Sequence, residues 1–206
     1  MTAILDHFVP AGPALDEARA DRIFREGRTA YGFTDEPVTD EQLDTIADLM
    51  RFPPTAMNMQ PLRVVLVSSP EAKARLLPHL AEGNRPKSAS APVVAILAAD
   101  TDFHETLPRV APHIRGAREM FADRGAREDA ARFNATLQAG YFILAARAAG
   151  LDAGPMGGFD RAGLDAEFFG GGPVKSFMVV NLGHVAADGT YPRSPRLEPG
   201  EVFTRL

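Results

Sequence analysis

The amino-acid sequence predicts an α+β fold with few strands and several helices. Three observations predict this class. Only three short runs are apolar and β-branched enough to form buried strands, and they lie at 63–67, 92–99 and 177–183. Helical patterns occupy much of the remaining chain, and one of them is far longer than the others. Strands and helices do not alternate regularly, so a doubly wound parallel sheet is not predicted.

Two helical patterns precede the first strand. Residues 14–26 place apolar side chains roughly at helical spacing. After a turn-rich connection, Thr39 and Gln42 have the spacing of a capping box, in which each side chain hydrogen-bonds the backbone of the other residue. The helix that begins there should end before Pro53 and Pro54, because the residue before a proline avoids the helical region.

The central part of the chain contains one short helix, one irregular segment and one long helix. A hydroxyl followed by a proline predicts a helix from Ser69 to about Leu80. Residues 101–128 are the least periodic part, which we interpret as a surface excursion with one helical piece. Residues 128–151 predict the longest helix. Between 137 and 149 it is apolar on nearly every side, which predicts burial in the core or in a subunit interface.

Composition and charge exclude several classes of function. The 206 residues include 27 acidic and 22 basic side chains, and the resulting net charge of −5 argues against general nucleic-acid binding. There is no cysteine, so disulfides, iron–sulfur clusters and thiol nucleophiles are excluded. Neither a secretory signal nor a membrane span of ~20 apolar residues is visible. The simplest expectation is one soluble, cytoplasmic domain, 1–206, with extensions at 1–13 and 198–206.

The sequence contains no motif for a catalytic side chain. The nucleotide-binding patterns GxGxxG and GxxxxGK[ST] and the hydrolase pattern GxSxG are absent. The five histidines have neither HxH nor HExxH spacing, so no metal site is predicted. Asp160 and Asp165 are interpreted as ordinary loop or helix-start charges. We therefore expect no catalytic residue from the protein itself: if the chain is an enzyme, a cofactor does the chemistry.

Four segments suit one planar, anionic ligand. Residues 27–29 offer a guanidinium group and a hydroxyl beyond a helix end, and 193–197 offer two more arginines held by a proline. Residues 52–61, FPPTAMNMQP, combine a stiff backbone with amide and hydroxyl groups that can hydrogen-bond a ring system. Residues 154–160, GPMGGFD, permit close approach of a ligand to the backbone. Each segment, taken alone, also fits a purely structural connection.

Together and in this order, the four segments resemble the FMN-dependent nitroreductase family. PTAMNMQP at 54–61 is similar to that family's P-S-x-x-N-x-Q-P, and GPMGGFD and the later PRL resemble its other flavin contacts. GRTAYGF, FHETLPRVAPH and GLDAGPMGGFD also resemble the subgroup that contains the malonic semialdehyde reductase of the Rut pathway of pyrimidine degradation.

The resemblance implies a fold, an assembly and a set of cofactor contacts. The expected fold is a central, mostly antiparallel sheet surrounded by helices, in an intertwined homodimer with two FMN sites at the interface. The apolar long helix and the C-terminal tail would then contact the second subunit. The implied contacts to the phosphate are Arg28, Thr29, Arg193 and Arg196, and those to the ring are Pro54, Thr55, Ala56 and Asn58. The implied contacts to the flavin edge are Asn84 and Asn134, and those to the flavin face are Pro155, Met156, Gly157 and Gly158.

The implied reaction is a ping-pong hydride transfer from NADH or NADPH to a small-molecule acceptor. The subgroup resemblance implies reduction of malonic semialdehyde (3-oxopropanoate) to 3-hydroxypropanoate, for which Lys87, Arg115 and Arg118 are candidate carboxylate anchors. One alternative is a broad-specificity NAD(P)H nitroreductase or quinone reductase, and another is a flavin-binding protein without turnover. Tyr31 and Gly27 stand where the family often has basic residues, which predicts a less positive phosphate pocket.

Overall fold

A four-stranded antiparallel sheet forms the centre of the protein. The computed structural model describes residues 15–206, so the extension expected at 1–13 lies outside the described residues. The strand order is β1-β2-β4-β3, and every neighbouring pair is antiparallel. The strands are β1 (Leu62–Val67), β2 (Val93–Asp100), β3 (Asp152–Met156) and β4 (Val174–Gly183). The predicted α+β class with an antiparallel central sheet is confirmed.

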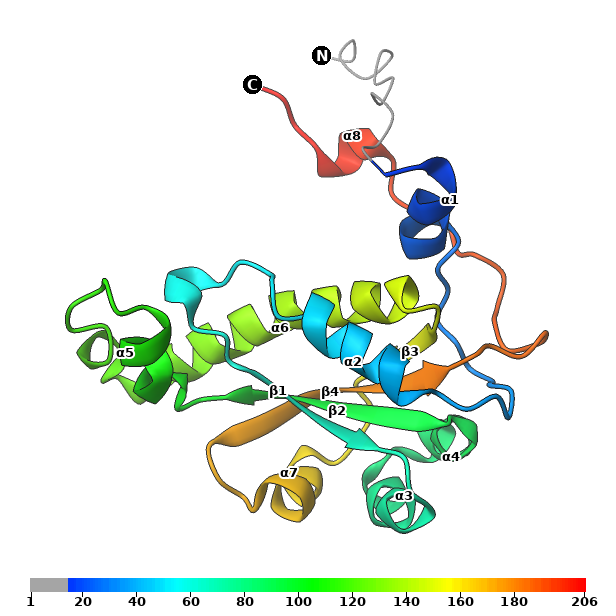
Figure 1. Cartoon of the computed structure of the whole chain (residues 1–206), viewed down its shortest axis with the longest axis horizontal. Helices are drawn as coiled ribbons and strands as arrows, with labels where there is room; N and C mark the ends of the chain where they lie inside the picture. The colour runs from blue at the N-terminus through cyan, green and yellow to red at the C-terminus, as the bar shows by residue number, and fades with distance from the viewer. Residues whose placement is uncertain (1–14) are drawn as a thin grey trace.

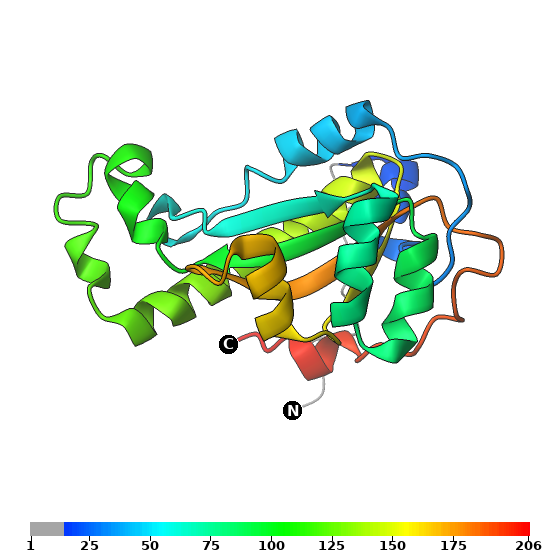
Figure 2. The same ribbon diagram turned by 90° about the horizontal axis from the view of Figure 1, so that it is seen from below.

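Helices cover both faces of the sheet, as Figures 1 and 2 show. One face packs against α6 (Arg124–Ala148), which in turn contacts α2 (Asp40–Leu49). On the other side lie α3 (Pro70–Leu76), α4 (Arg85–Ser90) and α7 (Arg161–Phe169). Each face has its own apolar cluster. The shorter helical pieces are α1 (Glu17–Ala20), a π-helical turn (Asp21–Arg25), α5 (Leu107–Val110), α8 (Pro199–Val202) and 3₁₀ turns at 56–58, 77–79, 82–84, 103–106 and 119–121.

Local signals explain where two of these helices begin. The amide of Gln42 donates to the Thr39 hydroxyl at 3.2 Å, and the Thr39 amide donates to the Gln42 side chain at 3.0 Å. The predicted capping box is therefore confirmed, and α2 ends before Pro53 as expected. The Ser69 hydroxyl accepts from the Ala72 amide at 3.1 Å, with a proline in the first turn of α3.

The segment 154–160 is only partly the glycine-rich turn that the sequence suggested. Gly154, Pro155 and Met156 belong to β3, which pairs with β4 from Asp152 to Met156. Glycine and proline disfavour strands locally, but β3 is an edge strand of the sheet, where a proline is tolerated because no further strand pairs along its outer side. The edge that β4 offers overrides the local preference.

The segment 101–128 is not merely a surface excursion. It contains several short helical pieces rather than one, and both Phe103 and Leu107 are fully buried. The long helix begins at Arg124, four residues earlier than expected, because the Asp123 carboxylate caps the Ala126 amide at 2.8 Å. Within 137–149, Tyr141 is 41% exposed in the single chain, so the core does not bury this run on every side, and burial in a subunit interface stays a prediction.

Asp165 is not a helix-start charge either, whereas Asp160 does cap α7. Asp165 lies inside α7, is buried, and accepts a hydrogen bond from the Ser176 amide at 2.8 Å. Its carboxylate therefore joins α7 to β4. No helix within residues 15–206 combines the length and the apolar character that crossing a membrane requires.

Candidate functional site

A pocket of about 210 Å³ unites two of the four segments, although they lie at opposite ends of the sequence. Residues 27–29 form one wall and residues 191–196 form the other. The complete lining is Gly27, Arg28, Thr29, Tyr31, Arg147, Tyr191, Pro192, Arg193, Ser194 and Arg196. The lining thus includes four arginines and two hydroxyl side chains of serine and threonine, and it includes no carboxylate.

Main-chain carbonyl groups hold the arginines of this pocket. Arg28 Nη2 donates to the Tyr191 carbonyl at 2.9 Å, which ties the two walls together. Arg193 Nη2 donates to the Gly27 carbonyl at 3.2 Å, and Arg196 Nη1 donates to the Ser194 carbonyl at 2.9 Å. Within residues 15–206, none of these three forms an ion pair with a carboxylate. A guanidinium group has five N–H donors, so each retains donors for an anion.

The sheet edge fixes the wall formed by residues 27–31. Thr29 makes a parallel bridge with Ala153 of β3, and the Ala30 amide donates to the Ala153 carbonyl at 3.0 Å. A Cβ atom at Gly154 would lie 2.4 Å from the Ala30 carbonyl oxygen, so only glycine allows this approach. The Tyr31 amide then donates to the Gly189 carbonyl at 2.7 Å. The wall is therefore held on both sides.

Arg147 is a pocket residue that the sequence analysis missed. It comes from the last turn of α6, within the run LQAGYFILAARAA. It is the only charged residue between 137 and 149, and this isolation is the signal that could have identified it. With Arg147 the pocket contains four guanidinium groups, although Gly27 and Tyr31 carry no charge.

A second cluster brings residues 84–88 beside residues 156–158. Asn84 Nδ2 donates to the Gly158 carbonyl at 2.8 Å, and the Ser88 hydroxyl lies 3.8 Å from the Met156 sulfur. Gly157 and Gly158 are exposed, and a Cβ at Gly158 would lie 2.9 Å from Asn84 Nδ2. Of the predicted face residues, Pro155 and Met156 are half-buried in β3, and only the glycine pair is open to solvent.

Tyr31 connects the second cluster to the arginine pocket. Its ring packs edge-on against Tyr191 with 4.8 Å between centroids, and Lys87 Nζ lies 5.0 Å from the Tyr31 ring centroid. Cations are attracted to the face of an aromatic ring. The Asn84–Gly158 contact, Lys87, Tyr31 and the arginines therefore belong to one continuous region.

The segment 54–60 makes most of its polar contacts within its own chain. The Ala56 amide donates to Asn134 Oδ1 at 2.9 Å, and Asn58 Nδ2 donates to the Val110 carbonyl at 2.8 Å. Asn134 is buried, so within one chain it lies beneath the segment 54–60. Pro54, Ala56 and Asn58 are exposed, and Thr55 is half-buried. Met57, Asn58 and Gln60 have φ values of 50°, 54° and 42°, in the left-handed region that non-glycine residues rarely adopt.

This strained segment lies at the end of the sheet opposite the arginine pocket. Pro61 is hydrogen-bonded to Asp100, at the end of β2, whereas Thr29 is linked through Ala153 and Leu182 to Val93, at its start. The two ends of β2 are about 23 Å apart at ~3.3 Å per residue. In Figure 1 the 3₁₀ turn at 56–58 lies toward α5, whereas α1 and the C-terminal segment lie at the other end of the sheet. Within one chain, the segment 54–60 therefore does not reach the arginine pocket.

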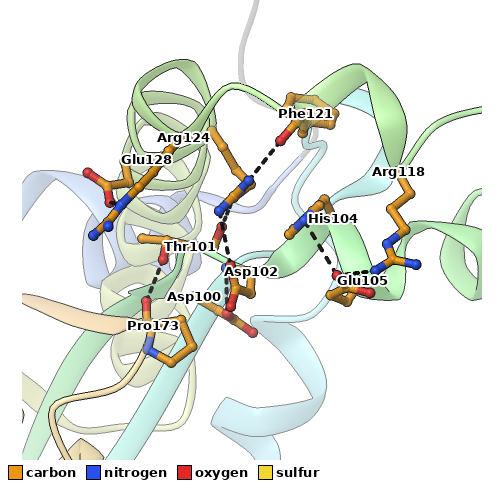
Figure 3. A network of polar contacts seen from close by, with 11 residues as sticks. Asp100, Thr101, Asp102, His104, Glu105, Arg118, Phe121, Arg124, Glu128 and Pro173 are labelled. Atoms are coloured by element: carbon orange, nitrogen blue, oxygen red, sulfur yellow. Dashed lines mark hydrogen bonds and ion pairs between the residues drawn. The ribbon is translucent and has the colours of Figure 1, made fainter.

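The three candidate substrate anchors lie in different surroundings. Arg118 Nη2 pairs with Glu105 Oε1 at 2.8 Å, and His104 approaches the same carboxylate at 3.5 Å, as Figure 3 shows. Arg115 is exposed. Lys87 is half-buried beside Tyr31, and within residues 15–206 it forms no ion pair. Only Lys87 adjoins the arginine pocket.

The donor set of this region fits a phosphorylated flavin. A phosphate monoester carries about −1.5 to −2 charges at neutral pH and accepts hydrogen bonds on three oxygens. Four guanidinium groups with spare donors, together with Thr29 and Ser194, match that chemistry. The exposed backbone at Gly157 and Gly158 leaves room for a flat ring, since a Cβ at Gly157 would meet no atom within 4 Å.

Comparisons with known proteins agree with this geometry. The sequence pattern of the Nitroreductase family matches residues 25–184. A "Putative NADH dehydrogenase/NAD(P)H nitroreductase" of Streptomyces griseus subsp. griseus is 57% identical over 193 residues, covering 93% of this chain and 98% of the relative. One of the same name from Leptothrix cholodnii is 54% identical over 186 residues, covering 90% and 94%. A solved structure, titled "putative nitroreductase in complex with FMN" and from Exiguobacterium sibiricum, has a similar fold, with a TM-score of 0.77, 24% identity, and coverage of 90% and 96%.

Proposed function

This chain belongs to the nitroreductase family, and we propose that it is an FMN-dependent NAD(P)H oxidoreductase whose arginine pocket binds the flavin phosphate. The observation that carries the proposal is the pocket itself, in which residues 27–29 and 191–196 gather guanidinium groups and no carboxylate. In a chain of net charge −5, such a local cluster of cations fits an anionic ligand.

When bound, FMN supplies the hydride-transfer chemistry between NAD(P)H and the acceptor. The residues of the chain bind and orient it. Arg28, Arg193 and Arg196 hold the phosphate by charge-assisted hydrogen bonds. Asn84 donates to the Gly158 carbonyl at 2.8 Å and would thereby hold this backbone against one face of the ring. Orientation of this kind can recover several kcal/mol of an activation barrier.

We also propose that two copies of the chain build each site. Segment 54–60 is too far from the pocket in its own chain, so it contributes to the ring site of a second copy. The long helix offers a surface for that contact, because Phe133, Leu137, Tyr141 and Leu144 share one helical face. Of these, Phe133 and Tyr141 are 71% and 41% exposed. Sedimentation of the FMN-bound protein should give a dimer, and Phe133→Asp should shift it toward monomer and release flavin. A monomeric wild-type protein that still binds FMN would contradict this arrangement.

For the electron acceptor, the best-supported proposal is a nitroaromatic or quinone of broad range. The arginines and the glycine pair define a flavin site, but Arg118 is paired with Glu105 and Arg115 lies apart from the pocket, so neither supplies a carboxylate anchor there. The names of the relatives also refer to NADH dehydrogenase and NAD(P)H nitroreductase activity.

Lys87 favours a second candidate, the reduction of malonic semialdehyde to 3-hydroxypropanoate. Its ammonium group adjoins the pocket and would attract the carboxylate of this substrate. Steady-state kinetics should compare malonic semialdehyde with a nitroaromatic and a quinone, for the wild type and Lys87→Met. If malonic semialdehyde is the substrate, its kcat/KM exceeds the others and Lys87→Met lowers it selectively. A ratio of one or less would remove this candidate.

Turnover itself is tested by anaerobic titration. NADH or NADPH should bleach the bound flavin, and a quinone or a nitroaromatic should restore its colour. Flavin that binds tightly but is reduced by neither nucleotide would contradict the proposed enzyme and favour a binding protein without turnover.

A further inference from the structure

Arg147 reaches the arginine pocket from a helix that is otherwise apolar near its end. Its guanidinium group donates from Nη1 to the Ile23 carbonyl at 3.0 Å and lines the pocket beside Arg28, Arg193 and Arg196. A cation in the last turn of a helix is favourable, and the Ile23 contact ties α6 to the N-terminal segment. These two features would be sufficient for a structural role, but they do not explain the surroundings of the guanidinium group.

Gly27 provides the space that this guanidinium group occupies. A Cβ atom at Gly27 would lie 2.3 Å from Arg147 Cζ and 2.6 Å from its Nε and Nη1. Any side chain at position 27 would therefore displace the guanidinium group. The glycine has a negative φ, so its requirement is the close approach of Arg147 and not a left-handed turn.

The charges around Arg147 favour the arrival of an anion. Burial lowers the pKa of Arg147, the positive charges of Arg193 and Arg22 lower it further, and Asp152 opposes them. Within residues 15–206, Arg147 has no carboxylate within ion-pair distance, and Asp152 is paired with Arg22 at 3.7 Å. A partly buried cation facing other cations is stabilised when an anion binds among them.

We infer that Arg147 is a fourth phosphate-binding residue, which lets the site select phosphorylated flavin over the unphosphorylated form, and that Gly27 keeps its place open. The inference rests on the proposed function, because it assumes that the pocket receives the flavin phosphate. It adds a residue from the core of the fold to a site otherwise built from the two ends of the chain. It also means that the residue at position 27 determines whether the Arg147 guanidinium group can occupy its place in the pocket.

The test compares the dissociation constants of FMN and riboflavin, measured by quenching of flavin fluorescence in the full-length protein. Removal of one charge-assisted contact should weaken FMN binding about tenfold or more. Arg147→Met should do so and leave riboflavin binding unchanged, while Arg147→Lys should lie in between. The control Arg132→Met changes an exposed arginine of the same helix and should preserve both constants.

Gly27→Ala is the second variant, and it applies even if Arg147→Met fails to fold. The added methyl group displaces the guanidinium group without altering α6, so the preference for FMN over riboflavin should again fall. An unchanged preference in Gly27→Ala, or equal losses for FMN and riboflavin in Arg147→Met, would overturn the inference. Arg28→Ala distinguishes failure of this inference from failure of the proposed phosphate site. If Arg28→Ala reduces the preference for FMN over riboflavin and Arg147→Met does not, only this inference fails. If neither variant reduces it, the proposed phosphate site fails as well.

Discussion

Gln138 hydrogen-bonds the residue that follows the segment 54–61, and its replacement gives a quantitative test of the fold around this segment. Gln138 Oε1 accepts a hydrogen bond from the Leu62 amide at 2.9 Å, where the segment enters β1. Both residues are buried, with Gln138 only 3% exposed. Gln138→Leu introduces an apolar side chain of similar size and removes the acceptor, so the Leu62 N–H is left without a partner.

A buried donor without a partner costs about 1–3 kcal/mol. In a chain of 206 residues each kcal/mol lowers Tm by about 2–4 °C, so we expect a decrease between about 2 and 12 °C. The assay is thermal and urea unfolding at fixed protein and FMN concentrations, since ligand binding and association both shift apparent stability.

Thr136→Ala is the matched control, because Thr136 lies on the same helix, is exposed, and bonds only a carbonyl of its own helix. It should change stability by less than about 0.5 kcal/mol. If Gln138→Leu were as mild as this control, the hydrogen bond to Leu62 would not be holding the segment, and the reasoning would be refuted.

Substitutions at three further positions test the site and the fold. Arg28→Ala should raise the dissociation constant for FMN about tenfold or more, because a charge-assisted contact contributes about 1.5–3 kcal/mol; titration at several salt concentrations checks this, and unchanged binding would argue against the phosphate assignment. Thr39→Ala removes the capping box and should cost about 1 kcal/mol in urea unfolding while leaving FMN affinity intact; a loss of affinity would mean that α2 supports the site. Asp165→Ala leaves the buried Ser176 amide unpaired and should cost about 1.5–3 kcal/mol, whereas Asp165→Asn keeps an acceptor and should lose less; equal losses would show that the hydrogen bond is not the cause.

Features set by short-range interactions were predicted correctly from the sequence, and features set by long-range interactions were not. Thr39 and Ser69 correctly predicted the starts of α2 and α3, because a capping hydrogen bond joins residues only three apart. The strands at 63–67, 92–99 and 177–183 were predicted within a few residues, because a buried strand requires a continuous apolar run. Asp165 was misread, since nothing near it in sequence reveals that its partner is an amide on β4.

The sequence by itself determined the α+β class, the capped helices and the two arginine-containing segments of the pocket. Only the tertiary structure decided that those segments meet, that Gly154–Met156 joins the sheet, and that Arg147 reaches the pocket past Gly27. The physical reason is that a local pattern specifies contacts within a turn or two of the chain. The assembly of a site depends instead on sheet pairing and on the steric fit between residues more than a hundred positions apart, such as a guanidinium group and the glycine that makes room for it.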